Sequence, residues 1–277
     1  MQKWELEEKL LEYRQSIIED EKAIKSRSKY MREAEAVVNC FDGKDLTKED
    51  VIALKQGYLF QGLKASTINN KIICINRFLK FCGLDDLKVK LLKTQKTKSL
   101  KEILSIADYK RLLRHAKAMH DDEIYMIMKV LAETGIRISE LHYFTVENLS
   151  YYIEVRNKGK NRTIIIRQDL LRELKKYCRE HHIKCGSVFA NKDTGKMIHE
   201  TTIRKRMKKV AAHAHVDKSL VHPHMFRHLF AVLYLDQNNN NVLELADLLG
   251  HESLETTRIY TRTTDDIKRK KLEKMKY

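Results

Sequence analysis

Apolar residues recur at helical spacing through the first part of the chain. The spacing predicts one helix from Trp4 to Glu21 and another from Ser66 to Cys82. The apolar positions of these two stretches are Leu6, Leu10, Ile17 and Ile18, followed by Ile68, Ile72, Ile75 and Leu79. Between them, Thr47 and Asp50 have the spacing of a helix N-cap and the carboxylate of its third position. Residues 1–86 are therefore expected to form a small helical domain.

The second part of the chain combines helical patterns with one alternating stretch. An amphipathic helix is expected up to Gly135, and further helices are expected over residues 201–218, from Pro223, and from Asn241 to Gly250. The stretch around residue 159 instead favours a β-hairpin, because β-branched and aromatic runs at Tyr151 to Val155 and Thr163 to Ile166 flank a polar turn. The pattern predicts a mainly α fold with a small β-hairpin in the C-terminal domain (α+β).

A lysine-rich stretch separates the two patterns. Residues 87–102 hold Lys88, Lys90, Lys93, Lys96, Lys98 and Lys101. A charge run of this kind is typical of a solvated linker, and it also suits contact with a phosphate backbone. We expect residues 103–277 to form the second domain, with residues 265–277 as a charged tail.

The charge of the chain indicates a polyanionic partner. Lys and Arg number 54 against 38 for Asp and Glu, which gives a formal net charge of +16 over 277 residues. The excess gathers in the lysine stretch and on one predicted helix, at Arg204, Lys205, Arg206, Lys208 and Lys209. Clustered basic residues favour nucleic acid. We expect no membrane partner, since no apolar run approaches the roughly 20 residues that span a bilayer, and the charged start favours a cytoplasmic protein.

Cysteine and histidine spacing argues against a metal site. The five cysteines lack a Cys-x-x-Cys pair, and the 12 histidines include no His-Glu-x-x-His motif. We therefore expect reduced cysteines and no cofactor or metal.

Several residues of the second domain suit phosphodiester chemistry. Cleaving a phosphodiester without a metal requires cations for the developing charge, a nucleophile, and an acid for the leaving oxygen. Arg137 follows a glycine turn, and His224 and Arg227 stand three apart near the start of one helix. His251 precedes Tyr260 by nine residues, with a helix cap and a short helix between them. Each residue alone also suits an ordinary structural role.

Taken in order, these segments resemble a known family. The stretches ETGIRISEL, the lysine hairpin, HPHMFRH and LLGHESLETTRIYT follow one another between about Ser105 and Thr264. This succession resembles the tyrosine recombinase (phage integrase) family, in particular its two-domain Xer-like members. The resemblance implies a helical, SAM-like core-binding domain and a catalytic domain that close around DNA as a clamp.

The resemblance also implies roles for individual residues. Arg137 and Arg227 would clamp the scissile phosphate, and Tyr260 would attack it to give a 3′-phosphotyrosine and a free 5′-hydroxyl. His224 would assist proton transfer with Tyr260, and His251 would donate a hydrogen bond to the phosphate.

The general acid has two candidates. The family hairpin commonly reads Gly-Lys-Gly-x-Lys-x-Arg, whereas residues 157–162 read Asn-Lys-Gly-Lys-Asn-Arg and are one residue shorter. Lys158 precedes the glycine as in the family and is preferred as the acid that protonates the leaving oxygen; Lys160 is the alternative. Glu140 matches an acidic family position that supports the arrangement of the site.

The resemblance predicts a site-specific recombinase. Such an enzyme would exchange strands between two double-stranded DNA sites through a Holliday junction, as a homo-tetramer on DNA and with possible accessory proteins. It would associate with the nucleoid, and the absence of a further N-terminal arm-binding domain favours the simpler recombinases. The alternatives are a type IB topoisomerase, which relaxes supercoils as a monomer, and a DNA-binding regulator without catalysis.

Overall fold

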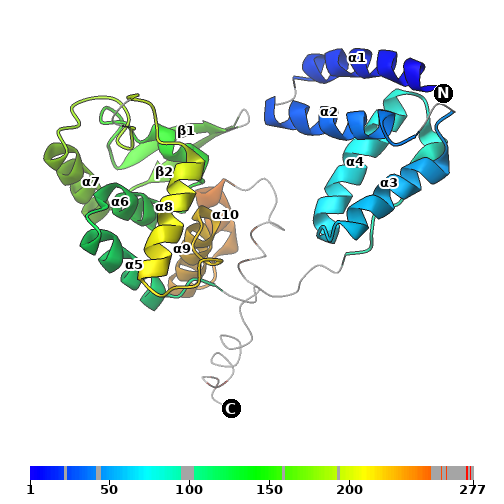
Figure 1. Ribbon diagram of the computed structural model, residues 1–277. Coiled ribbons are helices and arrows are strands. Elements are labelled where there is room, and N and C mark those ends of the chain that lie inside the picture. The colour runs from blue at the N-terminus through cyan, green and yellow to red at the C-terminus, as the bar shows by residue number, and fades with distance from the viewer. Residues whose placement is uncertain are drawn as a thin grey trace. The chain divides into compact units, whose positions relative to one another are not determined.

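The chain divides into two compact units, Met1–Lys96 and Thr97–Tyr277, which are described separately (Figure 1). A computed structural model describes residues 1–21, 24–41, 45–94, 103–157, 160–191 and 194–250, together with Thr257, Tyr260, Glu273 and Met275. The fold class is the predicted one, mainly helical with a two-stranded antiparallel sheet.

The first unit is helical in its described part. Its elements are α1 (Lys3–Glu19), α2 (Ile24–Val38), α3 (Lys48–Phe60), α4 (Ala65–Phe81) and the short 3-10 helix η1 (Asp85–Leu87). The predicted cap at Thr47 is present, since its side chain accepts a hydrogen bond from the backbone N–H of Asp50. The apolar face of α4 is buried as its spacing predicted, and it packs against α2. Periodicity and capping therefore identified α1, α3 and α4, whereas α2 and η1 were not predicted.

Part of the predicted linker packs on the first unit. The side-chain amide of Asn76 donates a hydrogen bond of 2.9 Å to the carbonyl of Val89, and that of Asn69 donates one of 3.0 Å to the carbonyl of Leu92. Val89 is buried in the core of this unit. Residues 88–92 therefore lie along the first unit, while residues 95–102 lie outside the described residues.

The second unit is built around the buried helix α6 (Asp122–Thr134). Its other helices are α5 (Ile106–Ala118), the 3-10 helix η2 (Ile138–Tyr143), α7 (Gln168–Glu180), α8 (Glu200–His213), α9 (Pro223–Gln237) and α10 (Val242–Leu249). α6 contacts α5, α7, α8 and α9, and its apolar residues belong to one large core. The end of α6 is therefore held firmly between the neighbouring helices.

The hairpin and one helix differ in length from their predictions. Strands β1 (Tyr152–Asn157) and β2 (Lys160–Ile165) reach closer to the turn than predicted, since Asn157 pairs with Lys160. Backbone pairing does not require apolar side chains, so the polar end of the hairpin continues the ladder. Helix α8 ends at His213 instead of residue 218, because His215 adopts a left-handed conformation with φ of 49°.

Neither a membrane span nor a metal cluster occurs in the described part of the chain. No described helix has the length and hydropathy to cross a membrane. Within the same residues, no three His, Cys, Asp or Glu side chains gather in a way that would hold a metal ion.

Candidate active site

Arg137 is placed by the sharp end of α6. Gly135 closes that helix in the left-handed conformation, with φ of 64°, and Arg137 is the N-cap residue before η2. A Cβ atom at Gly135 would lie 2.4 Å from Cδ1 of Phe230 and 2.9 Å from Cδ2 of Leu249. Only glycine fits both the backbone conformation and this close approach. The turn therefore packs directly against α9 and α10.

A buried carboxylate orients Arg137. Glu140 is 1% exposed, and it accepts hydrogen bonds of 2.8 Å from the backbone N–H of Arg137 and 3.2 Å from its Nη1. Arg162, on β2, also donates to Glu140 through Nη2. A charge-assisted pair of this kind fixes a guanidinium more firmly than a neutral hydrogen bond does. Glu140 therefore holds the Arg137 guanidinium in place.

Arg227 is the most deeply buried cation among the predicted site residues that the structure describes. It is 2% exposed, and its Nη1 and Nη2 each donate a hydrogen bond of 2.7 Å, to the carbonyls of Gly135 and Leu249. Burial, followed by the charge of Arg137, lowers the pKa of Arg227 to about 10, while a hydrogen bond with Tyr260 opposes the shift. The guanidinium remains protonated at neutral pH and is held in one orientation.

The C-terminal end of α10 brings three arginines together. Its last carbonyls, those of Leu248, Leu249 and Gly250, accept hydrogen bonds from Arg162, Arg227 and Arg137 respectively, the last at 3.4 Å. The end of a helix carries partial negative charge on its unpaired carbonyls, which favours nearby cations. Guanidinium groups from three separate segments thereby converge on one turn of backbone.

His224 lies on the first turn of α9, beside these cations. Its side chain is exposed at the helix surface. Desolvation by neighbouring atoms, followed by the charges of Arg227, Arg204 and Arg137, lowers the pKa of His224. The neutral imidazole, which can accept a proton, is therefore favoured at neutral pH.

Tyr260 lies beside Arg227 and is 6% exposed. Its ring packs with Ala231, Leu235, Leu245 and Leu249. The ring of His228 meets it edge to face, with the centroids 4.9 Å apart, and Arg227 forms a hydrogen bond with the tyrosine side chain. The predicted nucleophile and Arg227 of the predicted phosphate clamp are therefore in direct contact.

The structure brings together only part of the predicted set. Arg137, His224, Arg227 and Tyr260 form one cluster, as the electrostatic effects on His224 and Arg227 show. Lys158 and His251 lie outside the described residues, as does most of the helix predicted from residue 253 to 260. The side chain of Lys160, the alternative acid, is likewise outside them.

Sequence reasoning overlooked Arg162 and placed Arg206 wrongly. Arg162 stands in the hairpin motif that was compared with the family, so a signal was present, but its partners are distant in sequence. Arg206 was counted among the clustered basic residues expected to favour nucleic acid, whereas its guanidinium pairs with Asp121, at 3.0 Å from Nε, and with Glu123. These carboxylates attract the side chain inward and remove it from the exposed basic face.

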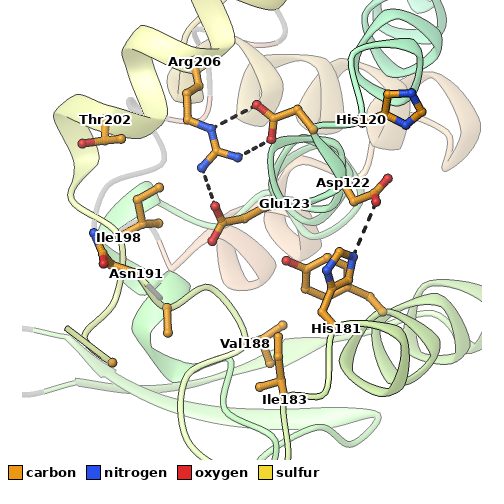
Figure 2. Close-up of a pocket in the computed structure, with 14 residues that line it drawn as sticks. His120, Asp122, Glu123, His181, Ile183, Val188, Asn191, Ile198, Thr202 and Arg206 are labelled. Atoms are coloured by element: carbon orange, nitrogen blue, oxygen red, sulfur yellow. Dashed lines mark hydrogen bonds and ion pairs between the residues drawn. The ribbon is translucent and has the colours of Figure 1, made fainter. Parts of the chain in front are cut away.

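Arg206 lines a separate cavity of about 550 Å³. The cavity lies between the start of α6, the end of α7 and α8, and Figure 2 shows Arg206 reaching across it to Glu123. On the opposite wall, His181 lies 3.5 Å from Asp122. None of the predicted site residues that the structure describes lines this cavity.

Comparison with known proteins identifies the family. The model of the phage integrase family matches residues 97–266, more than half of the chain. The chain is 29% identical to tyrosine recombinase XerA of Pyrococcus furiosus, over 80% of this chain and 79% of the relative. It is 26% identical to tyrosine recombinase XerD of Rhizobium meliloti, over 80% of this chain and 78% of the relative.

Solved structures share the fold. A crystal structure of a lambda integrase dimer bound to a COC′ core site superposes with a TM-score of 0.75 and 17% identity, over 94% of this chain and 77% of that one. The resemblance carried by the four sequence motifs is thus confirmed by the family model and by the fold. The chain belongs to the phage integrase family.

Proposed function

We propose that this protein, a site-specific recombinase of the phage integrase family, cleaves and rejoins DNA through Tyr260. The observation that carries the proposal is the contact between Tyr260 and Arg227, whose guanidinium is fixed by the carbonyls of Gly135 and Leu249. A phosphate held by Arg227 and Arg137 would lie near the tyrosine hydroxyl, since Arg227 forms a hydrogen bond with the Tyr260 side chain. Two preorganised cations beside a nucleophile suit attack on a phosphodiester.

In the cleavage step, the Tyr260 oxygen forms a bond to phosphorus while the bond from phosphorus to the 5′-oxygen breaks. The electron pair of that bond passes to the 5′-oxygen, which takes up a proton and leaves as a hydroxyl, and the 3′-phosphate remains on the tyrosine. Arg137 and Arg227 oppose the charge that develops on the phosphate oxygens. Because they supply the positive charge, the proposed reaction includes no metal ion.

Three further groups complete the proposed chemistry. His224 accepts the proton of the Tyr260 hydroxyl, which agrees with its lowered pKa. His251 donates a hydrogen bond to the phosphate, and Lys158 protonates the leaving 5′-oxygen, with Lys160 as the alternative acid. The phosphotyrosine bond keeps the free energy of the broken phosphodiester, so a 5′-hydroxyl from a partner strand can reverse the step without a cofactor.

The proposed partner is double-stranded DNA that carries a specific recombination site. The N-terminal domain (residues 1–86) and the catalytic domain (residues 103–277) would close around it, and the exposed Lys205, Lys208 and Lys209 of α8 provide one basic face for its backbone. A lambda integrase tetramer bound to a Holliday junction has the same fold, with a TM-score of 0.74 and 16% identity, which supports a homo-tetramer here. The chain would act at the nucleoid, with accessory proteins as possible partners.

The proposal is tested by trapping the covalent intermediate. Fragmented genomic DNA is incubated with the protein, adducts that survive denaturing detergent are collected, and the attached DNA is sequenced. The site found in this way is then built into a suicide substrate, nicked so that the leaving fragment diffuses away. The expected result is a stoichiometric adduct that Tyr260→Phe abolishes.

A matched control is available in the same cluster. Tyr234 packs against the apolar cluster that contains Tyr260, and Tyr234→Phe should retain adduct formation. Absence of any adduct, or an adduct that persists in Tyr260→Phe, would contradict the proposal. Relaxation of plasmids without sequence dependence would instead indicate a topoisomerase.

A further inference from the structure

Arg162 belongs to the same cluster, although no role has yet been assigned to it. Its side chain, 11% exposed, extends from β2 to Glu140 and to the carbonyl of Leu248 at the end of α10. Arg162 of the hairpin thereby forms hydrogen bonds both with Glu140, which holds Arg137, and with the end of α10, which holds Arg227.

The path of the Arg162 side chain is fixed by its packing. Gly250, left-handed with φ of 62°, lies so close that a Cβ atom there would be 2.5 Å from Cδ of Arg162 and 3.1 Å from its Nε. The aliphatic part of Arg162 therefore rests on the turn that ends α10, and its guanidinium is delivered to Glu140 in one orientation.

The charges around Arg162 indicate its electrostatic role. Glu140 is buried, and a buried carboxylate without a cation carries a large desolvation cost. It pairs with both Arg137 and Arg162. Arg162 is the more buried of the two cations, at 11% against 34% for Arg137, so Arg162 is directed at Glu140 while Arg137 also faces solvent. Among the described ion pairs of Glu140, loss of Arg162 would leave the pair with Arg137.

We infer that Arg162 is a positioning residue that neutralises Glu140 and so leaves the charge of Arg137 available to the scissile phosphate. The inference rests on the proposed function, in which Arg137 binds that phosphate. Loss of Arg162 should draw the Arg137 guanidinium toward Glu140 and weaken its grip on the transition state.

A change in the charge of the substrate tests this inference. In a methylphosphonate, one non-bridging oxygen of the scissile phosphate is replaced by a methyl group, which removes the negative charge and leaves the attacked phosphorus and the 5′-leaving oxygen in place. On natural DNA, Arg162→Met should lower the single-turnover rate of adduct formation about tenfold or more relative to the unaltered protein. On methylphosphonate DNA the ratio of the two rates should shrink to within about twofold, because a neutral phosphate needs less positive charge.

Companion variants separate charge from shape. Arg162→Lys keeps the cation and should retain more activity than Arg162→Met. In the double variant with Glu140→Gln, no carboxylate competes for Arg137, and the rate should recover above that of Arg162→Met. Arg172, exposed on α7, provides the matched control, and Arg172→Met should behave as the unaltered protein.

The contrary outcomes are distinct. The inference would be overturned if Arg162→Met lowered the rate of adduct formation equally on natural and methylphosphonate DNA. It would also be overturned if Arg162→Lys were no more active than Arg162→Met. Either result would indicate a purely structural role. If Arg162→Met does not fold, the rates of Arg162→Lys and of the unaltered protein are compared on the two substrates instead. A deficit of Arg162→Lys that is equal on both substrates would then overturn the inference. Failure of the proposed function would be recognised separately, since the unaltered protein would then form no adduct.

Discussion

Replacing Gly135 with alanine should destabilise the second unit and displace the cations of its site. The left-handed backbone costs a residue with a Cβ atom about 1 to 2 kcal/mol, and overpacking a filled core adds about 1 to 3 kcal/mol. Both costs apply here, since φ is 64° and the new Cβ would lie 2.4 Å from Cδ1 of Phe230 and 2.9 Å from Cδ2 of Leu249. Gly135→Ala is therefore expected to lower the free energy of unfolding by about 2 to 5 kcal/mol.

Gly186 offers a matched control within the same unit. Its φ is 75°, and no atom lies within 4 Å of an added Cβ, so Gly186→Ala should show the backbone cost alone, about 1 to 2 kcal/mol. The single Trp of the chain is Trp4, in the first unit. Tryptophan fluorescence would therefore report on the first unit, and hydrogen exchange of the slowest amides in α6 and α9 is the better measure for the second.

The two variants also differ in their expected effect on chemistry. The carbonyls of Gly135 and Leu249 hold Arg227, so displacement of Leu249 or of the turn should slow adduct formation even where the protein is folded. Gly186→Ala should leave that rate unchanged. Equal losses of stability in the two variants, together with normal cleavage by Gly135→Ala, would refute the interpretation of this turn as the support of Arg227.

Three further outcomes are expected. Arg227→Lys removes the planar guanidinium that donates to two carbonyls, and it should slow adduct formation by about 100-fold. DNA binding, measured by fluorescence anisotropy, should change little. An unchanged rate of adduct formation would contradict the proposed phosphate clamp. Burial lowers the pKa of His228 from 6.5 to about 4, so its imidazole binds a proton more tightly in the unfolded chain than in the folded one. The free energy of unfolding should therefore fall as the pH is lowered from about 6.5 to about 4, by up to about 3 kcal/mol. Urea unfolding followed by circular dichroism should show a flatter pH dependence of this free energy for His228→Phe. Inorganic sulfate should slow hydrogen exchange in α9 of the unaltered protein more than in Arg227→Met, and equal protection would argue against an anion site at Arg227.

Local signals in the sequence were enough to predict much of the fold. The N-cap at Asn241 and the left-handed Gly250 bound α10 as predicted, because capping depends on residues three or four positions apart. The same holds for α6 up to Gly135. Where the structure differs, longer-range contacts decide: the carboxylates of α6 turn Arg206 inward, and Asn76 binds residue 89 of the predicted linker.

Of the predicted site residues, four lie together in the described part of the chain, while Lys158 and His251 lie outside it. The motifs named Arg137, His224, Arg227 and Tyr260, and the structure gathers these four. Spacing along α9 placed Arg227 on a helix face, but it did not show that the guanidinium is buried between carbonyls 92 and 22 residues away in sequence. Such partners follow from tertiary packing, and a pattern of three or four residues carries no information about them.

The cluster of cations is itself a source of strain within the fold. Arg137 lowers the pKa of Arg227, and Arg162 contributes in the same direction, so the three like charges oppose one another. Glu140 and the carbonyls that end α10 offset part of this repulsion. An anion bound at Arg137 and Arg227, as proposed, would relieve more of it, and a phosphate that gains negative charge in the transition state would relieve it further. In the proposed reaction, the repulsion among these arginines would therefore become a preference for the transition state over the bound substrate, which is the condition for faster cleavage.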